Sequence, residues 1–266
     1  MKQLKFATVI ILIIITYICS AASYSTPGWV LIWQDEFEGS SIDTSFWGYE
    51  LGCSGWGNNE WEEYTDSSDN AFIENGNLVI QAIDTGGGNC GYTSARLNTK
   101  GKVHYTYGKI EARIKMPYGQ GIWPALWMLG ENIDSFGWPQ CGEIDIVEMI
   151  GGWQGRDNVC VGTVHWNNFG HQSNGNSISV PWPETLANNY HIYSIEWNPT
   201  SIKWYFDDIL YHTLNIGAGM EEFQGKDFFI ILNLAVGGNW PGYPDDTTIF
   251  PQKMYVDYVR WYQWRE

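Results

Sequence analysis

The chain has 266 residues, of which 44% are hydrophobic and 17% charged, a composition that excludes a disordered protein. Its formal net charge of −16 at pH 7 argues against nucleic acid or another polyanion as a partner and suits a neutral ligand. The length is within the range of one large all-β domain.

Residues 1–22 have the pattern of an export signal. Lys2 and Lys5 precede an apolar run over residues 6–18, and small residues follow it up to Ala22. One alternative is a membrane anchor, but the run is shorter than the roughly 20 residues that span a bilayer. Another is lipidation at Cys19, which Ile18 disfavours because a small residue would be expected at that position. We therefore expect cleavage after Ala22 and a secreted protein without membrane attachment. The mature chain then has 12 basic and 30 acidic residues, a formal charge of −18.

Short runs rich in β-branched and aromatic residues recur along the chain, with Gly- and Asn-containing turns between them. Within Lys109–Met116, polar and apolar residues alternate at nearly every step, which is the period of a strand with one solvated face. No amphipathic helix of three turns is predicted. Because there is no linker or internal repeat, we expect one all-β domain over residues 23–266, a sandwich or barrel. The predicted strands are Asn77–Ala82, Gly108–Met116, Val159–Trp166, His191–Trp197, Ile202–Phe206, Phe228–Val236 and Lys253–Tyr262.

Aromatic residues are unusually frequent, with 16 Trp, 16 Tyr and 11 Phe. Some of them must form an aromatic core, but several tryptophans stand beside Gly, Pro or Asn, as in loops. A flat apolar ring with one polar edge suits the apolar face of a sugar. The composition therefore favours carbohydrate binding. The loop tryptophans are Trp56, Trp138, Trp153, Trp182 and Trp240.

Four cysteines follow the export segment, and none forms a C-x-x-C pair, so neither a zinc site nor a redox motif is indicated. Export permits disulfides, and four cysteines allow three connectivities. We favour Cys53–Cys90, because both residues lie in Gly-rich stretches that would flank the same cleft.

The segment Gly142–Met149, with the sequence GEIDIVEM, contains the candidate catalytic acids. On a strand, Glu143 and Asp145 share one face, and strict alternation would send Glu148 to the other. A bulge at residues 146–147 adds one residue and returns Glu148 to the face of the other two acids. Three carboxylates on one wall would repel each other and raise the pKa of at least one.

Cleavage of a glycosidic bond requires such a set, with one protonated carboxyl beside the leaving oxygen and one ionised carboxylate at the anomeric carbon. We assign Glu143 as the nucleophile and Glu148 as the acid/base, with Asp145 setting which acid holds the proton. The alternative is a solvated acidic strand edge. Neighbouring aromatic segments favour catalysis, because Trp123–Trp127 precedes the acids and Val164–Trp166 follows them.

Residues 29–264 resemble glycoside hydrolase family 16, specifically its laminarinase-like endo-β-1,3-glucanases. The resemblance covers nearly the whole mature chain, and the long spacing of the acidic motif is highly specific. It is carried by Trp33–Phe37, Gly55–Glu60, Tyr92–Arg96, Trp123–Met128, Gly142–Glu148, Asn233–Gly242 and Met254–Arg260.

This resemblance implies a concanavalin-like β-jelly-roll sandwich with a concave carbohydrate-binding cleft and a retaining mechanism without a catalytic cofactor. It implies a structural calcium held by Glu38, Gly76 and Asp257, largely through backbone oxygens, as suits a hard cation. From the residues alone, Arg96 could instead form a structural ion pair, and His165 could be a hydrogen-bonded sheet histidine. The substrate-binding residues implied by the resemblance are Asn59, Arg96, Trp123, Trp127, His165 and Trp240.

The expected function is endo-acting hydrolysis of β-1,3-glucan of the laminarin type by a secreted monomer. Mixed-linkage β-1,3-1,4-glucan and transfer to a sugar acceptor are alternatives with the same chemistry. A non-catalytic β-glucan-binding protein is a third alternative, which the presence of all three acids disfavours. The acidic stretch Trp61–Tyr64 and the loop Asp134–Cys141 depart from the family pattern and leave the fine substrate preference open.

Overall fold

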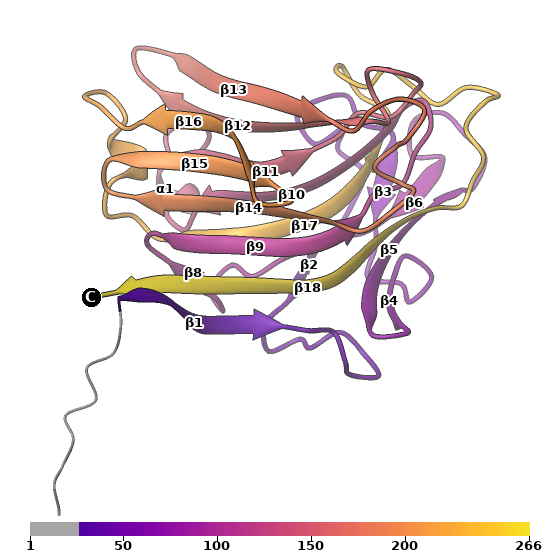
Figure 1. The fold of residues 1–266 in the computed structure, drawn as a ribbon. Helices are drawn as coiled ribbons and strands as arrows, with labels where there is room; N and C mark the ends of the chain where they lie inside the picture. Colours follow the sequence, from indigo (N-terminus) through magenta and orange to yellow (C-terminus); the bar gives the residue numbers. More distant parts are fainter. Residues whose placement is uncertain (1–26) are drawn as a thin grey trace, which may run out of the picture.

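The structure, a computed structural model, describes residues 27–266 as two β-sheets packed face to face (Figure 1). The expected export segment, residues 1–22, lies outside the described residues. The strands are β1 (Gly28–Asp35), β2 (Gly48–Glu50), β3 (Glu62–Tyr64), β4 (Ala71–Glu74), β5 (Asn77–Asp84), β6 (Tyr92–Ser94), β7 (Arg96–Asn98), β8 (His104–Tyr105), β9 (Gly108–Lys115), β10 (Ile122–Gly130), β11 (Glu143–Glu148), β12 (Val159–Asn167), β13 (His171–Ser179), β14 (His191–Asn198), β15 (Ser201–Phe206), β16 (Ile209–Asn215), β17 (Phe228–Val236) and β18 (Gln252–Arg265). The helical elements are the single turns α1 (Ile133–Phe136) and η1 (Glu221–Phe223).

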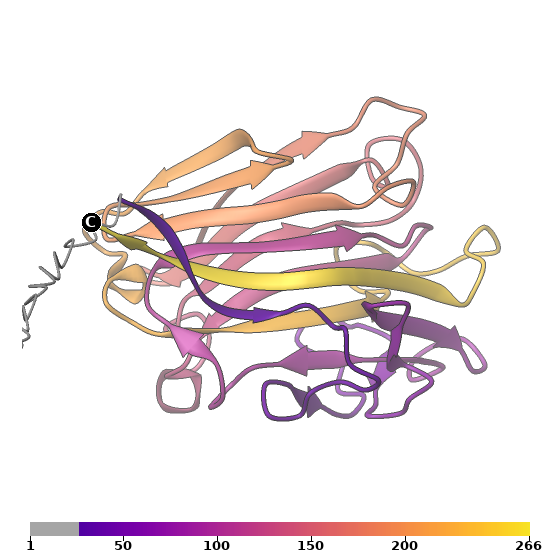
Figure 2. The ribbon, with the colours of Figure 1, turned by 60° about the horizontal axis from the view of Figure 1, so that its bottom comes forward.

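One sheet has ten strands in the order β16-β15-β14-β9-β18-β5-β6-β3, with β1 beside β18 and β4 beside β5. The other has eight strands in the order β13-β12-β11-β10-β17-β7-β2, with β8 beside β17. Some neighbours are consecutive in sequence, such as β10 to β13, whereas others are distant, such as β9 and β18. The first and last strands, β1 and β18, pair antiparallel (Figures 1 and 2). This all-β sandwich confirms the predicted fold class.

Alternation along the strands places one row of side chains between the sheets. On β9, Ile110, Ala112 and Ile114 are fully buried. β17 is buried along its whole length, because one of its faces packs in the main core and Phe229 and Ile231 on the other face pack in a second apolar cluster with Leu129 and Cys141. All seven predicted strands are present, and Phe228–Val236 has the predicted bounds.

The predicted disulfide is also present, since Cys53 and Cys90 are bonded with their Cα atoms 5.8 Å apart. Cys141 and Cys160 are buried free thiols. Within residues 27–266, no helix has the length and apolarity needed to cross a membrane.

Candidate active site

A cleft of about 610 Å³ lies over the outer face of the eight-stranded sheet. Its floor consists of side chains from β7, β10, β11, β12 and β17, so five strands of one sheet position its chemistry. All three acids of the motif line it. Five of the six predicted substrate-binding residues line it as well, namely Arg96, Trp123, Trp127, His165 and Trp240.

Asn59 is the exception, because it stands on the rim and does not line the cleft. Its backbone has a φ of +57°, and its side chain donates a hydrogen bond to the Asn239 side chain at 2.9 Å. Its neighbours Asn58 and Glu60 line the cleft instead. The sequence therefore located this loop at the cleft, but the turn presents the residues on either side of the one expected.

The predicted bulge in β11 is present. Trp127 pairs with Asp145 and Leu126 with Val147, which leaves Ile146 as the extra residue opposite β10. The ladder to β12 shifts between Asp145 and Glu148. Because of this insertion, Glu148 shares the cleft face with the other two acids, while Ile146 and Val147 are buried in the core.

A tryptophan of the opposite sheet supports this bulge. Trp204 on β15 donates its indole N–H to the backbone carbonyl of Asp145 at 2.8 Å. Gly162 on β12 leaves space for that ring, since a Cβ there would stand 2.3 Å from Trp204 Cδ1. A buried carbonyl thus has a hydrogen-bond partner, and the acidic strand is tied to the core.

Each acid has different neighbours. Trp138 Nε1 donates to Glu143 Oε2 at 2.8 Å, and Trp123 Nε1 donates to Glu148 Oε1 at 3.0 Å. Asp145 is only 2% exposed, and its Oδ2 lies 3.3 Å from His165 Nε2. The same histidine nitrogen is 3.8 Å from Glu143 Oε1, so His165 faces both of these acids.

Burial and mutual repulsion keep these carboxyls protonated to unusually high pH. Burial raises the pKa of Glu143 to about 8, the Asp145 charge adds to the rise, and His165, Trp138 and Arg96 oppose it. Burial and the Glu143 charge raise the pKa of Glu148 to about 7, against the Trp123 hydrogen bond. Burial and the Glu148 charge raise the pKa of Asp145 well above its usual range. Because the acids interact, they lose protons in steps that belong to the group.

Aromatic rings form one wall of the cleft around a cation. The Arg96 guanidinium lies 5.0 Å from the Trp56 ring centre and 4.7 Å from that of Trp127, and it forms an ion pair with Glu50. The structural ion pair considered for Arg96 therefore exists, and the same side chain also lines the cleft. Trp123 meets Trp240 edge to face at 5.5 Å.

Several residues of the site were not predicted from the sequence. Glu60 is a buried cleft residue whose carboxylate accepts from Asn58 at 3.0 Å. Trp138 and His171 reach the cleft from a loop and from β13, and Asn233 on β17 accepts the Trp127 indole N–H at 2.7 Å. The loop tryptophan signal and the atypical loop Asp134–Cys141 had pointed to Trp138 without giving it a role.

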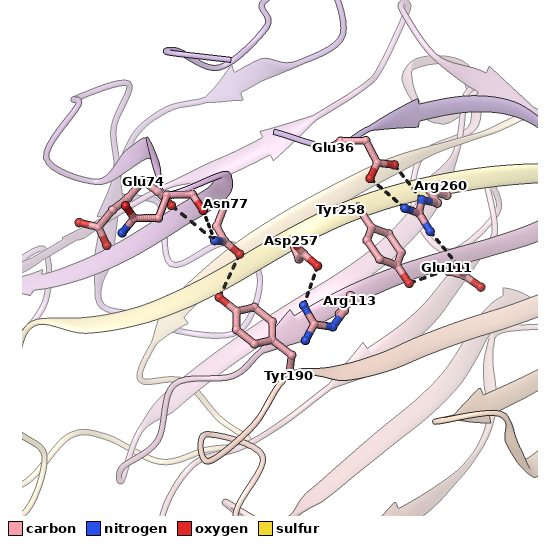
Figure 3. A network of polar contacts seen from close by, with 10 residues as sticks. Glu36, Glu74, Asn77, Glu111, Arg113, Tyr190, Asp257, Tyr258 and Arg260 are labelled. Carbon is pink, nitrogen blue, oxygen red and sulfur yellow. Dashed lines mark hydrogen bonds and ion pairs between the residues drawn. The ribbon is translucent and has the colours of Figure 1, made fainter. Parts of the chain in front are cut away.

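The calcium prediction concerns a different surface. On the ten-stranded sheet, Asp257 Oδ2 accepts a hydrogen bond from Arg113 at 2.6 Å, within a network of ion pairs (Figure 3). A calcium ion there would have to use the other carboxylate oxygen of Asp257 together with the Glu38 and Gly76 backbone. Calcium binding by these residues stays a prediction.

Within the described residues, one acid and histidine group is spaced closely enough for a metal. Ligand atoms of Glu143, Asp145 and His165 lie within 4.8 Å of one another. Two of these residues are carboxyls of β11, and all three line the cleft, so the group is part of the candidate active site.

Buried carboxyls on one strand, inside a cleft walled by tryptophans, define a glycosidase type of site. Comparison with known proteins agrees. The model of the glycosyl hydrolases family 16 matches residues 58–260. The chain belongs to this family.

Three of its relatives match over nearly the whole of both chains. The Beta-glucanase of Rhodothermus marinus is 40% identical, covering 93% of this chain and 90% of the relative. The Glucan endo-1,3-beta-glucosidase of Cryptopygus antarcticus is 37% identical, covering 91% and 95%. The laminarinase catalytic domain from Thermotoga maritima is 45% identical with a TM-score of 0.81, covering 90% and 99%. The sandwich is therefore the jelly roll of these enzymes, as expected.

Proposed function

We propose that the protein is a secreted endo-β-1,3-glucanase that cleaves laminarin-type glucan with retention of configuration. The observation that carries this proposal is the bulged strand β11, which brings Glu143, Asp145 and Glu148 into one tryptophan-lined cleft. The names of the relatives support β-1,3-glucan as the substrate. An open cleft that crosses several strands suits attack within a polymer.

In the proposed reaction, Asp145 keeps its proton because it is the most deeply buried of the three acids. A neutral Asp145 removes the charge that opposes ionisation of Glu143, and the Trp138 indole N–H and His165 stabilise the resulting Glu143 carboxylate. This ionised carboxylate can attack the anomeric carbon. The pKa of about 8 for Glu143 includes the effect of an Asp145 charge, and a neutral Asp145 removes that contribution. Once Glu143 is ionised, its charge raises the pKa of Glu148, so Glu148 is the acid that keeps its proton and donates it to the leaving oxygen.

The first step forms a bond between Glu143 and the anomeric carbon as the glycosidic bond breaks, and the departing chain leaves with the Glu148 proton. In the second step, Glu148 takes a proton from water, whose oxygen attacks the same carbon and displaces Glu143. The second displacement restores the starting configuration and both carboxyls. Side chains alone perform the reaction, so the proposal requires no cofactor.

The test uses the chain from residue 23 onward with laminarin, mixed-linkage β-1,3-1,4-glucan and cellulose, counting new reducing ends. Short oligosaccharides from laminarin are expected early, and Glu143→Gln should lose many orders of magnitude of rate while still binding the glucan. Faster cleavage of the mixed-linkage glucan would replace the substrate assignment. Glucan binding without any cleavage by the wild-type protein would overturn the enzyme assignment.

Secretion is part of the same proposal and rests on the pattern of residues 1–22. The Cys53–Cys90 disulfide supports it, since such bonds persist in oxidising compartments. Sequencing the N-terminus of the protein recovered outside its host cells should give Ser23 as the first residue. Recovery of the intact N-terminus in the membrane fraction would favour the anchor instead.

A further inference from the structure

His171 of β13 points a ring nitrogen at His165, the histidine that faces the acids. Its Nε2 lies 2.8 Å from His165 Nδ1, and the two ring planes differ by 20°. With ring centres 5.1 Å apart, such a short contact requires the two nitrogens to point at each other along the line between the rings. The rings are therefore joined edge to edge by a hydrogen bond, as opposed to being stacked face on face.

This hydrogen bond restricts where the His165 proton can be. A neutral pair can form this bond in two ways, with His171 Nε2–H donating to His165 Nδ1 or with His165 Nδ1–H donating to His171 Nε2. The ionised Glu143 carboxylate, whose Oε1 lies 3.8 Å from His165 Nε2, favours the first arrangement, in which the proton of neutral His165 is on Nε2. If His165 is protonated, its Nδ1–H donates to His171, and Nε2 again carries a proton. In both states an N–H faces Asp145 Oδ2 at 3.3 Å and Glu143 Oε1 at 3.8 Å.

We propose that His171 is a positioning residue for the reaction, which fixes His165 in the form that presents Nε2–H to Asp145 and Glu143. The kinetic consequence of this inference rests on the proposed function, but the His165 tautomer can be measured in the free protein without any reaction. It gives β13, an edge strand of polar and exposed residues, a role in the site.

The surroundings of the pair agree with this role. Trp138 packs against His171 with ring centres 4.6 Å apart, so the residue that bonds Glu143 also supports the outer histidine. Among the described residues, the carboxyls within ion-pair distance of the pair are Glu143 and Asp145 of β11. Burial and the neighbouring His165 lower the pKa of His171, which favours the neutral ring that can donate or accept through Nε2.

Removal of His171 should free the His165 ring. The tautomer with Nδ1–H would then present a lone pair to the acids, which disfavours their ionised forms. We expect kcat/KM on laminarin to fall about tenfold in His171→Ala, the lower end of the loss that follows when the partner orienting a metal-binding histidine is removed. The acidic limb of the pH profile should move to higher pH, because the nucleophile must ionise. His171→Gln should keep most of the wild-type kcat/KM and leave the acidic limb close to its wild-type position, since the glutamine amide can donate or accept a hydrogen bond.

The decisive experiment reads the His165 tautomer by nitrogen NMR in the free protein with labelled histidine. We expect Nε2–H in the wild type and in His171→Gln, and a mixture with Nδ1–H in His171→Ala. The control is His104→Gln, which removes a histidine paired with Asp227 at 3.2 Å and should leave the His165 tautomer and the pH profile unchanged.

An Nε2–H tautomer that persists in His171→Ala would overturn the proposal, as would an equal loss of rate in His171→Gln and His171→Ala. The NMR result does not depend on catalysis. If the wild-type protein fails to cleave any glucan, the proposed function is wrong, while the tautomer still decides whether His171 positions His165.

Discussion

Two indole hydrogen bonds offer a direct test of which acid is the nucleophile and which is the acid/base. Trp123 donates to Glu148 and Trp138 donates to Glu143, each from one Nε1 atom, at 3.0 and 2.8 Å. Phenylalanine at either position keeps an aromatic ring but removes the donor. Trp123→Phe should therefore raise the pKa of Glu148, and Trp138→Phe should raise that of Glu143.

The size of the effect follows from the strength of the bond. A hydrogen bond to a charged group contributes about 1.5–3 kcal/mol, and one pKa unit corresponds to about 1.4 kcal/mol. Water that replaces the indole recovers part of this, so we expect a shift of about one unit in each variant. Glu148 must be protonated, so Trp123→Phe should move the basic limb of kcat/KM to higher pH. Glu143 must be ionised, so Trp138→Phe should move the acidic limb to higher pH.

The assay is the pH dependence of kcat/KM on laminarin, which reports ionisations of the free enzyme. Trp153→Phe is the matched control, because Trp153 is 68% exposed and does not line the cleft, and neither limb should move. If Trp123→Phe moved the acidic limb and Trp138→Phe the basic one, the two acids would have exchanged roles. Unchanged limbs in both variants would refute the reasoning from the indole bonds.

Three further predictions concern the scaffold. Gly162→Ala should lower the free energy of unfolding by about 1–3 kcal/mol and reduce activity, because the added methyl displaces Trp204 from the Asp145 carbonyl. Gly217→Ala is the control, because an added Cβ there meets nothing within 4 Å, and it should change neither the free energy of unfolding nor the activity. If thermal melts and activity assays showed the same losses in Gly162→Ala and Gly217→Ala, the argument from Trp204 would be wrong. Glu62 is fully buried beside Glu60, and burial raises its pKa well above the usual range. Its protonated form therefore stabilises the fold below the ordinary pKa, and this stability is lost as pH rises through the raised value. Glu62→Gln should raise the unfolding temperature at alkaline pH, by about 2–4 °C for each kcal/mol recovered, and should have little effect in acid; a uniform shift at all pH values would argue against ionisation as the cause. If calcium binds at Glu38, Gly76 and Asp257, the unfolding temperature should rise with calcium concentration and fall again when a chelator is added. An unfolding temperature that changes with neither calcium nor chelator would contradict calcium binding at these residues.

Much of the fold was predictable, because local alternation marks a strand that has one face in the core. β9 was predicted on this basis, whereas β17, which is buried along its whole length, was predicted as a β-rich run between turn signals. β13 was not, since its residues are polar and mostly exposed, and only pairing with β12 makes it a strand. An edge strand of this kind has no apolar face to leave a period in the sequence.

The candidate site was also predictable only in part. The acids of β11 and the bulge between them lie within six residues, so sequence spacing alone determined their arrangement. His171 and Glu60 reach the cleft through the pairing of strands and the path of loops, which the sequence does not encode locally. Asn59 does not line the cleft as expected, because it has a left-handed backbone and its side chain hydrogen-bonds Asn239, a conformation that neighbouring residues in the sequence do not reveal.

The central claim is that Glu143 becomes covalently bound to the sugar. The most direct measurement uses a laminari-oligosaccharide with fluorine at C2 and a good leaving group at the anomeric carbon, which slows the second displacement so that the intermediate accumulates. Intact mass followed by peptide mapping should find one glycosyl group, attached to Glu143, and none in Glu143→Gln. Attachment to Glu148, or turnover of natural laminarin to products of inverted configuration, would contradict the account.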